Sequence, residues 1–420
     1  MTDRPMPDWV REHARDTPDA PALVFHGSVT TYAELDDAAD ESAEELSAKG
    51  VGAGSLMLLP AIPTPETVVL LVSGRRVGAI LAPFGPVQPY GELDPSVGAY
   101  AVVTTSGSSG DAKGVILTPG NITAAVTASQ ARLGNDARDR WLLCMPLYHI
   151  AGLSVVWRSL AAGGSVLIHE GFDPTDVADA LLEGEASMIS LVPTMLGRLL
   201  DADPGPYPGL TAVLLGGGPA GQDLVERGLD AGMPVLTTYG TTETASQVAT
   251  VSRGSEREAL GTAGAPLDAM TVTFHDGEIL VDGPAVFPGY LGEPPRTGPH
   301  HTHDLGHVDE HGRLVITGRI DDIILSGGEK VVPQYVEAVL ESFPDVRRAV
   351  VIGIRDDDWG QAAIAVLEAD ALDEEALRNR AHAALAAHQV PKQWVRVDAL
   401  PELPNGKIDR SSVASMLADD

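Results

Sequence analysis

The sequence has very little positive charge. Its 420 residues contain 28 lysines and arginines against 59 aspartates and glutamates, which gives a formal net charge of −31. Nucleic-acid backbones and anionic membrane surfaces attract clustered basic residues, so this balance argues against both as partners. If a nucleotide binds, a few local donors must hold its phosphates, because the overall field of the protein repels them.

Cysteine and long apolar runs are also scarce. The single cysteine, Cys144, excludes an internal disulfide and a thiolate zinc cluster. No run of about 18 apolar residues occurs, which argues against a membrane-spanning helix. The polar, acidic start lacks the basic-then-apolar order of a signal peptide. Because 44% of the residues are hydrophobic, the chain can bury a large core, and we expect a cytoplasmic protein.

Short apolar segments that alternate with helical patterns predict the fold class. Five segments in the first 300 residues are typical of strands in a mainly parallel sheet: AYAVVTTSG, SVLIHEG, MISLVPT, LTAVLLGG and MPVLTTYG. From about residue 262, TVTFHDGEILVDG has the turn residues of an antiparallel section. We predict an α/β fold with a large N-terminal domain over 1–318, a hinge over 319–321 and a mobile α+β domain over 322–420.

A polar, glycine-rich stretch, TTSGSSGDAKG, follows the strand AYAVV and is the first candidate site. Its glycines permit left-handed backbone, while its hydroxyls, N–H groups and one lysine can surround an anion. It is not a Walker loop, because Ala112 precedes Lys113 and Gly114 follows it. For this segment alone, a polar strand-to-helix turn is the alternative interpretation.

Three further stretches carry chemically useful side chains. YGTTETAS places an aromatic ring, hydroxyls and the carboxylate of Glu243 at a strand end, where Mg²⁺ and phosphoryl oxygens can bind. Asp304 precedes GRIDD and SGGE, and LPNGKIDR near the C-terminus puts Lys407 on a turn. Seen alone, a lysine on a Pro-Asn-Gly turn is usually a solvated surface residue.

In this order and spacing, the four motifs resemble those of the ANL superfamily of adenylate-forming enzymes, from about Thr30 to Arg410. The resemblance implies that a carboxylate attacks the α-phosphate of ATP and that a thiol, usually CoA, then displaces AMP. It implies ATP, Mg²⁺ and CoA as cofactors or co-substrates and a small carboxylic acid as the ligand. It is compatible with a homodimer.

The resemblance also implies a role for each matching residue. Lys407 would bridge the carboxylate and the α-phosphate, Glu243 would ligate Mg²⁺, and Asp321 would be the hinge. Gly328 and Trp359 would contact CoA in the second step; for Trp359 the alternative is an ordinary, partly buried side chain. The nucleotide-binding residues would be Thr105, Ser106, Gly107, Ser108, Ser109, Gly110 and Lys113 at the phosphates, Gly216, Gly217, Gly218 and Tyr239 at adenine, Gly240, Thr241 and Thr242 toward the α-phosphate, and Asp304 and Arg319 at the ribose. The implied catalytic set is Lys407, Glu243, His149 and Thr105.

The chain departs from the family pattern at several positions. Thr104 stands where an aromatic residue is common, Ala112 where proline is common, and His303 where a Thr-Gly-Asp motif has glycine. The stretch 79–103 is shorter than usual by several tens of residues, so part of the N-terminal subdomain is expected to be absent. The histidines between 300 and 311 have irregular spacing, and we do not expect them to bind a metal.

The carboxylic acid is expected to bind near PLYHIAG, the following helix and the end of YGTTETAS. No acidic residue stands early in this region to pair with an ammonium group, so an amino-acid substrate is disfavoured. Arg158 lies within the apolar segment LSVVWRSL, and a buried guanidinium needs an anion. A dicarboxylate supplies one; the alternative is a structural salt bridge.

These stretches look most like those of 2-succinylbenzoate–CoA ligases of menaquinone biosynthesis. We predict that the substrate is bound by His149, Arg158, Thr244 and Ser246. Two other functions remain open: a CoA ligase for another aryl or short-chain acid, and a non-catalytic adenylate-binding protein.

Overall fold

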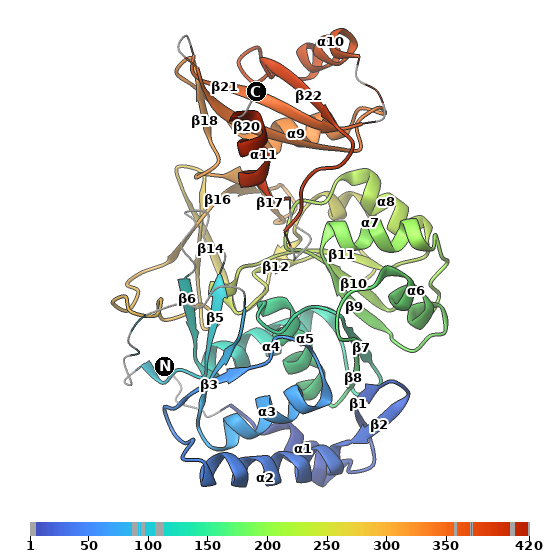
Figure 1. Cartoon of the computed structure of the whole chain (residues 1–420), viewed down its shortest axis with the longest axis vertical. Coiled ribbons are helices and arrows are strands. Elements are labelled where there is room, and N and C mark those ends of the chain that lie inside the picture. Colours follow the sequence, from blue (N-terminus) through green and yellow to red (C-terminus); the bar gives the residue numbers. More distant parts are fainter. Residues whose placement is uncertain are drawn as a thin grey trace.

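Three β-sheets in the first 319 residues and a fourth sheet near the C-terminal end organise the fold (Figure 1). The computed structural model describes residues 6–85, 91, 93, 97–105, 113–356, 359–369, 371, 373–403 and 408–418. A large, mainly parallel sheet with helices, accompanied by antiparallel sheets, confirms the predicted α/β fold class.

The largest sheet has nine strands in the order β13-β12-β11-β10-β9-β7-β8-β1-β2. Its central strands are parallel, and the pairs at both edges are antiparallel. Four of the five predicted strands lie here, as β8 to β11. The strand bounds are β1 (Pro21–Phe25), β2 (Ser28–Thr31), β7 (Arg140–Leu143), β8 (Ser165–Ile168), β9 (Met188–Leu191), β10 (Ala212–Leu215), β11 (Val235–Tyr239), β12 (Ala249–Thr250) and β13 (Ala265–Pro266).

A second sheet has the order β3-β4-β5-β6. It comprises β3 (Leu56–Leu59), β4 (Ile80–Pro83), β5 (Ala101–Thr105) and β6 (Lys113–Leu117). The β4 and β5 strands pair in parallel across a connection of only 17 residues, 84–100. This is close to the shortest crossover that a parallel pair allows, and it is the stretch predicted to be shortened.

Eight helices of the described residues accompany these two sheets. Most begin with an oxygen-bearing cap; Thr31 and Thr118 form capping boxes. Nine consecutive residues of α5, 152–160, are buried, because this helix packs inside the large core. The helices are α1 (Trp9–Asp16), α2 (Tyr32–Ala48), α3 (Pro65–Arg76), α4 (Pro119–Leu133), α5 (Ile150–Ala162), α6 (Pro174–Leu182), α7 (Pro193–Ala202) and α8 (Gln222–Asp230).

The third sheet is antiparallel, as the sequence predicts. Its first hairpin turns at Asp276 and Gly277, which both have positive φ (50° and 85°), as the favoured two-residue hairpin turn requires. Its strands are β14 (Thr271–His275), β15 (Glu278–Asp282), β16 (His300–Val308) and β17 (Leu314–Arg319). Two short 3₁₀ segments, η2 (Thr242–Thr244) and η3 (Arg257–Gly261), precede it.

The fourth sheet has its own apolar cores, drawn from residues after 323. The segments PQYVEAVLESFP and EEALRNRAHAALAAH predict helices, and VRRAVVIGI and AAIAVLE predict strands. They form α9, α10, β20 and β21, whereas β22 and α11 were not predicted. The elements are β18 (Ile324–Ser326), β19 (Glu329–Val331), α9 (Pro333–Glu341), β20 (Arg348–Asp356), β21 (Gly360–Glu368), α10 (Glu374–Ala384), β22 (Gln393–Val397) and α11 (Arg410–Ala418). In Figure 1 this unit stacks above the other sheets.

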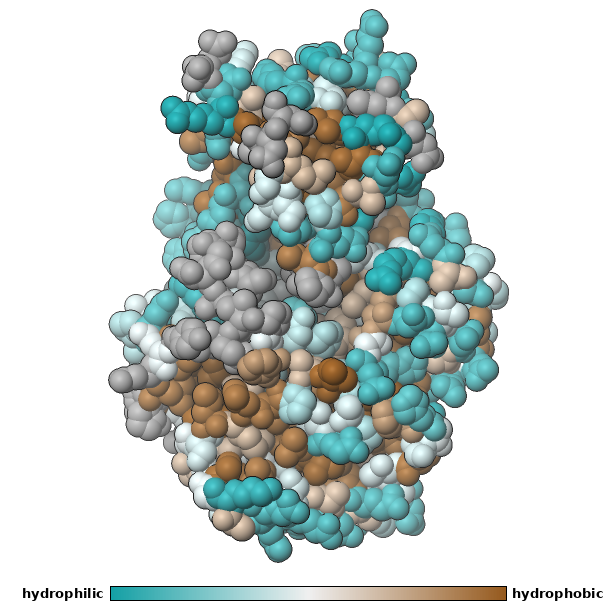
Figure 2. Space-filling view, viewed as in Figure 1, coloured by the Kyte–Doolittle hydropathy of each residue, from teal (hydrophilic) through white to brown (hydrophobic). Residues whose placement is uncertain are grey.

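Polar side chains dominate most of the viewed surface, and apolar surface gathers over the sheet that contains β3 (Figure 2). Leu56 and Leu58 of that edge strand are 60% and 57% exposed. Within the described part of the chain, no helix combines the length and the apolar composition that crossing a bilayer requires.

Candidate active site

The predicted site residues gather at the carboxyl ends of neighbouring parallel strands. His149 lies in the loop between β7 and α5, Gly216 to Gly218 directly follow β10, and Tyr239 ends β11. The β9, β10 and β11 strands are consecutive neighbours in the sheet, and β7 pairs with β9. Open α/β sheets bind ligands at this edge, because the loops there leave a crevice lined by backbone N–H groups and helix starts.

A buried carboxylate, Asp304 on β16, links the end of β11 to β17. It is 5% exposed, accepts a hydrogen bond from the Tyr239 hydroxyl (2.6 Å), and pairs with Arg319 Nη1 (2.8 Å). The antiparallel register of β16 and β17 places Asp304 directly opposite Arg319. Burial, together with the nearby Asp304 charge, raises the pKa of Tyr239 well above its usual value, so its hydroxyl remains a donor. The cluster can offer hydrogen bonds to a diol such as a ribose.

His303 has the backbone conformation that explains why glycine is usual at this position. Its φ is 60°, in the left-handed region that side chains other than glycine seldom adopt. Its ring Nδ1 lies 3.4 Å from an oxygen of Asp321, the predicted hinge residue. Arg319 approaches the other Asp321 oxygen at 3.7 Å, so this hinge residue is tied to the Asp304 cluster.

The turn after β11 requires its glycine and is stabilised from within. A Cβ atom on Gly240 would lie 1.5 Å from the carbonyl oxygen of Ser246. Thr244 is fully buried; its hydroxyl accepts from the N–H of Thr241 and donates to the Thr241 carbonyl, both at 3.0 Å. The side chains of Thr241 and Thr242 stay half-exposed at the strand end. The Thr244 side chain therefore stabilises the turn through hydrogen bonds to Thr241. Glu243 is the acidic residue of this turn.

Two residues that the sequence analysis did not single out contact Glu243 and Lys113. The Tyr290 hydroxyl donates to Glu243 Oε1 (2.9 Å), and Lys113 Nζ lies 4.6 Å from the centre of the Tyr290 ring. Lys113 also pairs with Glu293 at 3.0 Å. In the sequence, the aromatic residue between glycines in FPGYLGEP was the only indication of a functional role for this segment. Its contact with Lys113 of the first motif is visible only in the folded structure.

The glycine-rich stretch connects two antiparallel strands. Thr105 at the end of β5 pairs with Lys113 at the start of β6. The alternative of a strand-to-helix turn is therefore wrong, because the chain returns along the same sheet. Lys407 and the loop residues Ser106, Gly107, Ser108, Ser109 and Gly110 lie outside the described residues.

The described residues contain no cluster of three or more metal-ligating His, Cys, Asp or Glu side chains. A single carboxylate such as Glu243 still suits Mg²⁺, which commonly binds through one or two carboxylates together with substrate phosphates and water. Glu243 is thus compatible with a magnesium–nucleotide complex.

Arg158 lies inside the protein near the same turn. It is 4% exposed on α5, and its Nη2 donates to the Ser246 hydroxyl at 2.9 Å. The Ser154 hydroxyl lies 3.4 Å from that of Ser246, and the guanidinium lies 5.7 Å from the centre of the Trp141 ring. Among the described residues, no carboxylate comes within salt-bridge distance of Arg158. The predicted alternative of a structural salt bridge therefore has no partner in this part of the chain.

Gly152, in the first turn of α5, allows the helix to pack closely against the preceding loop. A Cβ atom on Gly152 would lie 2.5 Å from the carbonyl oxygen of Pro146. His149 caps α5 through its backbone carbonyl, which accepts from Gly152 N–H at 3.0 Å, while its ring packs against Tyr148 at 4.2 Å. His149 caps this helix and Arg158 lies about two and a half turns further along it. The arginine side chain leans toward the helix start, as helical side chains do.

Gly328 and Trp359, which are predicted to contact CoA, lie near each other but on a different sheet from Asp304 and Arg319. Gly327 and Gly328 form the turn between β18 and β19, with φ of 60° and 84°. The Trp359 ring packs over Gly327, and Lys392 Nζ lies 4.2 Å from its centre. Both strands belong to the upper sheet of Figure 1, whereas Asp304 and Arg319 lie on β16 and β17 below it.

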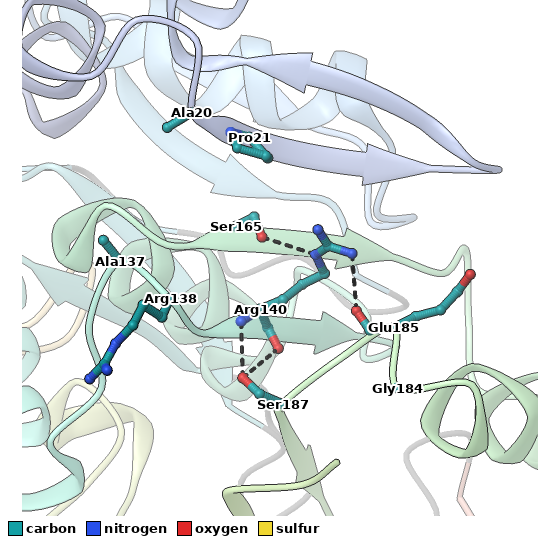
Figure 3. Close-up of a pocket in the computed structure, with 9 residues that line it drawn as sticks. All are labelled: Ala20, Pro21, Ala137, Arg138, Arg140, Ser165, Gly184, Glu185 and Ser187. Carbon is teal, nitrogen blue, oxygen red and sulfur yellow. Dashed lines mark hydrogen bonds between the residues drawn. The ribbon is translucent and has the colours of Figure 1, made fainter.

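A surface pocket of about 360 Å³ lies at the opposite, amino end of the central strands (Figure 3). Arg140 at the start of β7 donates there to the Ser165 hydroxyl (3.1 Å) and the Glu185 carbonyl (3.3 Å). None of the predicted site residues lines this pocket, because they follow the strands and do not precede them.

Comparison with known proteins identifies the family. The AMP-binding enzyme profile matches residues 10–97 and 92–291, and the profile of the AMP-binding enzyme C-terminal domain matches 335–407. A curated relative, the 2-succinylbenzoate–CoA ligase of Listeria monocytogenes, is 32% identical over 461 aligned residues, covering 97% of this chain and 99% of the relative. That alignment is longer than the 420-residue chain, which agrees with a shortened stretch; the two profile segments also meet between β4 and β5.

Two solved structures of o-succinylbenzoate CoA synthetase (MenE) from Bacillus subtilis are similar along the whole chain. The complex with ATP and magnesium is 29% identical, has a TM-score of 0.86, and covers 98% of this chain and 100% of that one. A double mutant bound to the product analogue OSB-NCoA is 30% identical and covers 99% of both chains, but its TM-score is 0.69. At nearly equal sequence identity, this chain superposes better on the complex with ATP and magnesium than on the complex with the product analogue.

Proposed function

This chain belongs to the family of AMP-binding enzymes, and on that premise we propose that it converts 2-succinylbenzoate, ATP and CoA to 2-succinylbenzoyl-CoA, AMP and diphosphate. It is an acid–thiol ligase that uses ATP, Mg²⁺ and CoA, and the reaction belongs to menaquinone biosynthesis. Support comes from the curated relatives with this name and from the strand-end cluster of Asp304, Tyr239, Arg319 and Glu243.

Arg158 is the observation that carries the choice of acid. Its guanidinium is buried without a carboxylate partner among the described residues, and it bonds Ser246 at the end of the predicted phosphate-binding turn. A monocarboxylic acid brings only the carboxylate that becomes activated. A dicarboxylic acid brings a second anion, which can neutralise Arg158 while the first carboxylate reaches the α-phosphate.

The proposed chemistry follows from charge. The attacking carboxylate and the triphosphate repel each other, so positive groups must stand where charge develops. Lys113 would hold the β- and γ-phosphates, and Lys407 would approach the carboxylate and α-phosphate. Mg²⁺ held by Glu243 would supply further positive charge to the phosphates. Tyr239 and the glycines after β10 would enclose the adenine, with Asp304 and Arg319 on the ribose.

We propose that the chain uses its two domains in turn, with the division at 319–321. The separate apolar cores before residue 315 and after residue 323 support this division. In the arrangement described here, Asp321 is tied to His303 and Arg319. Rotation about Asp321 would withdraw Lys407 and bring Gly328 and Trp359 toward the adenylate for attack by CoA.

Two finer points are also proposals. The need for ATP and CoA favours a cytoplasmic location. The exposed leucines of the edge strand β3 support a homodimer. Light scattering at micromolar concentration measures the mass of the particle in solution, and the mass of a monomer would refute the dimer. If the dimer uses this strand, Leu56→Glu together with Leu58→Glu should give monomers.

An acid panel tests the function. AMP release should be fastest with 2-succinylbenzoate and at least about 10²-fold slower, in kcat/KM, with aryl and short-chain acids that lack a second carboxylate. Equal turnover of benzoate or hexanoate would favour the second candidate, a ligase for another acid. Absence of ATP–pyrophosphate exchange with every acid would favour a non-catalytic adenylate-binding protein.

A further inference from the structure

The segment that follows β15 is held against two of the predicted nucleotide-binding motifs. The N–H of Phe287 donates to the carbonyl of Glu243 (2.8 Å), and the N–H of Leu291 donates to the carbonyl of Gly114 (2.7 Å). Tyr290 forms an isolated antiparallel bridge with Val115 on β6. The backbone around Tyr290 is therefore fixed relative to both the turn after β11 and the strand that begins with Lys113.

The side chain of Tyr290 contacts the charged group of each motif. Its hydroxyl donates to Glu243 Oε1 at 2.9 Å, and its ring face lies 4.6 Å from the ammonium of Lys113. The ring is half-buried and packs edge-on against Phe287 at 4.8 Å.

Other groups near Glu243 do not replace this hydrogen bond. His300 packs against Phe287 at 5.1 Å, but burial lowers its pKa to about 4, so it is neutral at physiological pH. In the described residues, no other side chain hydrogen-bonds to the Glu243 carboxylate. Tyr290 donates to Oε1 of Glu243, and the remaining lone pairs of the carboxylate can face a cation.

We infer that Tyr290 is a positioning residue that sets the spacing between Glu243 and Lys113, and thereby between the magnesium ion and the phosphates that these two groups would bind. Its hydroxyl orients the carboxylate, and its ring face attracts the ammonium. The inference rests on the proposed function, because it takes Glu243 as the magnesium ligand and Lys113 as the phosphate-binding cation.

The test is metal binding by the intact protein, measured by Mn²⁺ paramagnetic resonance with a non-hydrolysable ATP analogue. Tyr290→Phe removes only the hydroxyl and should weaken Mn²⁺ binding by roughly 10-fold, as is usual when a group that orients a metal ligand is lost. Tyr290→Leu also removes the ring face and should weaken binding of the ATP analogue itself. In ATP–pyrophosphate exchange, Tyr290→Phe should raise the half-saturating Mg²⁺ concentration while the KM for the acid is unchanged.

Tyr207→Phe is the matched control. Tyr207 is fully buried, and its hydroxyl donates to the Asp203 carbonyl at 2.7 Å, in the second core and away from the proposed site. Its loss should lower the melting temperature without changing Mn²⁺ affinity. Equal Mn²⁺ affinity in Tyr290→Phe and the wild type would overturn the inference.

Glu243→Gln separates this inference from the proposed function. If Glu243→Gln abolishes Mn²⁺ binding while Tyr290→Phe leaves it intact, the metal site stands and the positioning role of Tyr290 is wrong. If Glu243→Gln binds Mn²⁺ normally, the assignment of Glu243 as the metal ligand fails, and with it the role inferred for Tyr290.

Discussion

Replacing Arg158 by methionine should stabilise the ligand-free protein while it impairs turnover of the dicarboxylate. Burial lowers the guanidinium pKa from its ordinary value to about 9. At about 1.4 kcal/mol for each tenfold change in proton affinity, keeping the charge in place costs about 5 kcal/mol. The side chain is 4% exposed and its Nη2 bonds only a neutral hydroxyl, that of Ser246, so little in the described residues offsets this cost.

The expected gain is smaller than the full cost. Replacing buried charged groups by apolar side chains of similar volume has given up to about 4 kcal/mol of stability, and methionine fills a comparable space. Ser246 keeps the Ser154 hydroxyl as a partner at 3.4 Å. We therefore expect the melting temperature to rise by a few degrees, at roughly 2–4 °C per kcal/mol for a domain of 150–250 residues.

The same change should reduce activity toward the dicarboxylate. Loss of a charge-assisted hydrogen bond of about 1.5–3 kcal/mol lowers kcat/KM for 2-succinylbenzoate by about 10- to 100-fold, with little effect on an aryl acid that lacks the second carboxylate. Calorimetry and AMP-release kinetics measure the two effects.

Arg140→Met is the control for this prediction. Arg140 also bonds a serine hydroxyl, but it lies in the pocket at the amino end of the strands (Figure 3). Its replacement should not raise the melting temperature and should leave kcat/KM unchanged. A lower melting temperature with normal turnover of the dicarboxylate in Arg158→Met would refute the reasoning and assign Arg158 a structural role.

Three further predictions concern four residues. Glu293→Gln frees Lys113 from a half-exposed pair worth at most about 1 kcal/mol, so the KM for ATP should fall by less than about 5-fold; an increase in KM would contradict the pairing. Lys407→Ala should abolish ATP–pyrophosphate exchange yet still convert supplied acyl-adenylate to thioester. Gly328→Leu should keep the exchange and lose thioester formation. Equal loss of both steps in either variant would count against separate conformations for the two steps. His303→Gly places glycine at a left-handed backbone position and should raise the free energy of unfolding by about 1 kcal/mol, measured with urea. A lower free energy of unfolding would show that the contact between His303 and Asp321 stabilises the fold more than the backbone strain destabilises it.

Regular local patterns made much of the fold predictable. The strands β8 to β11 are short apolar runs closed by turn residues, and the HDGE turn between β14 and β15 has the residues that its geometry needs. β22 and α11 were missed. QWVRV alternates too briefly to indicate a strand without its parallel neighbour β21, and α11 is a short helix of mixed composition.

The site was predictable where side chains follow strand ends in the sequence. Glu243, Asp304 and Arg319 were identified from motifs, because backbone turns and charged groups stand side by side in the chain. Tyr290 and Glu293 were not, since they contact Lys113 from almost 180 residues away.

The sequence by itself determined which segments form helices and strands, and it carried the family resemblance. It also showed that positive charge is scarce, so each cation near the nucleotide is important individually. Tertiary structure alone decided which groups meet. It placed Asp304 opposite Arg319 through strand register, paired the two strands that flank the glycine-rich stretch in one sheet, and buried Arg158 beside Ser246 without a described carboxylate partner. The physical reason is that hydrophobic periodicity is a local property of the chain. Pairing energies between charged and polar side chains depend on distances that only the packed structure sets.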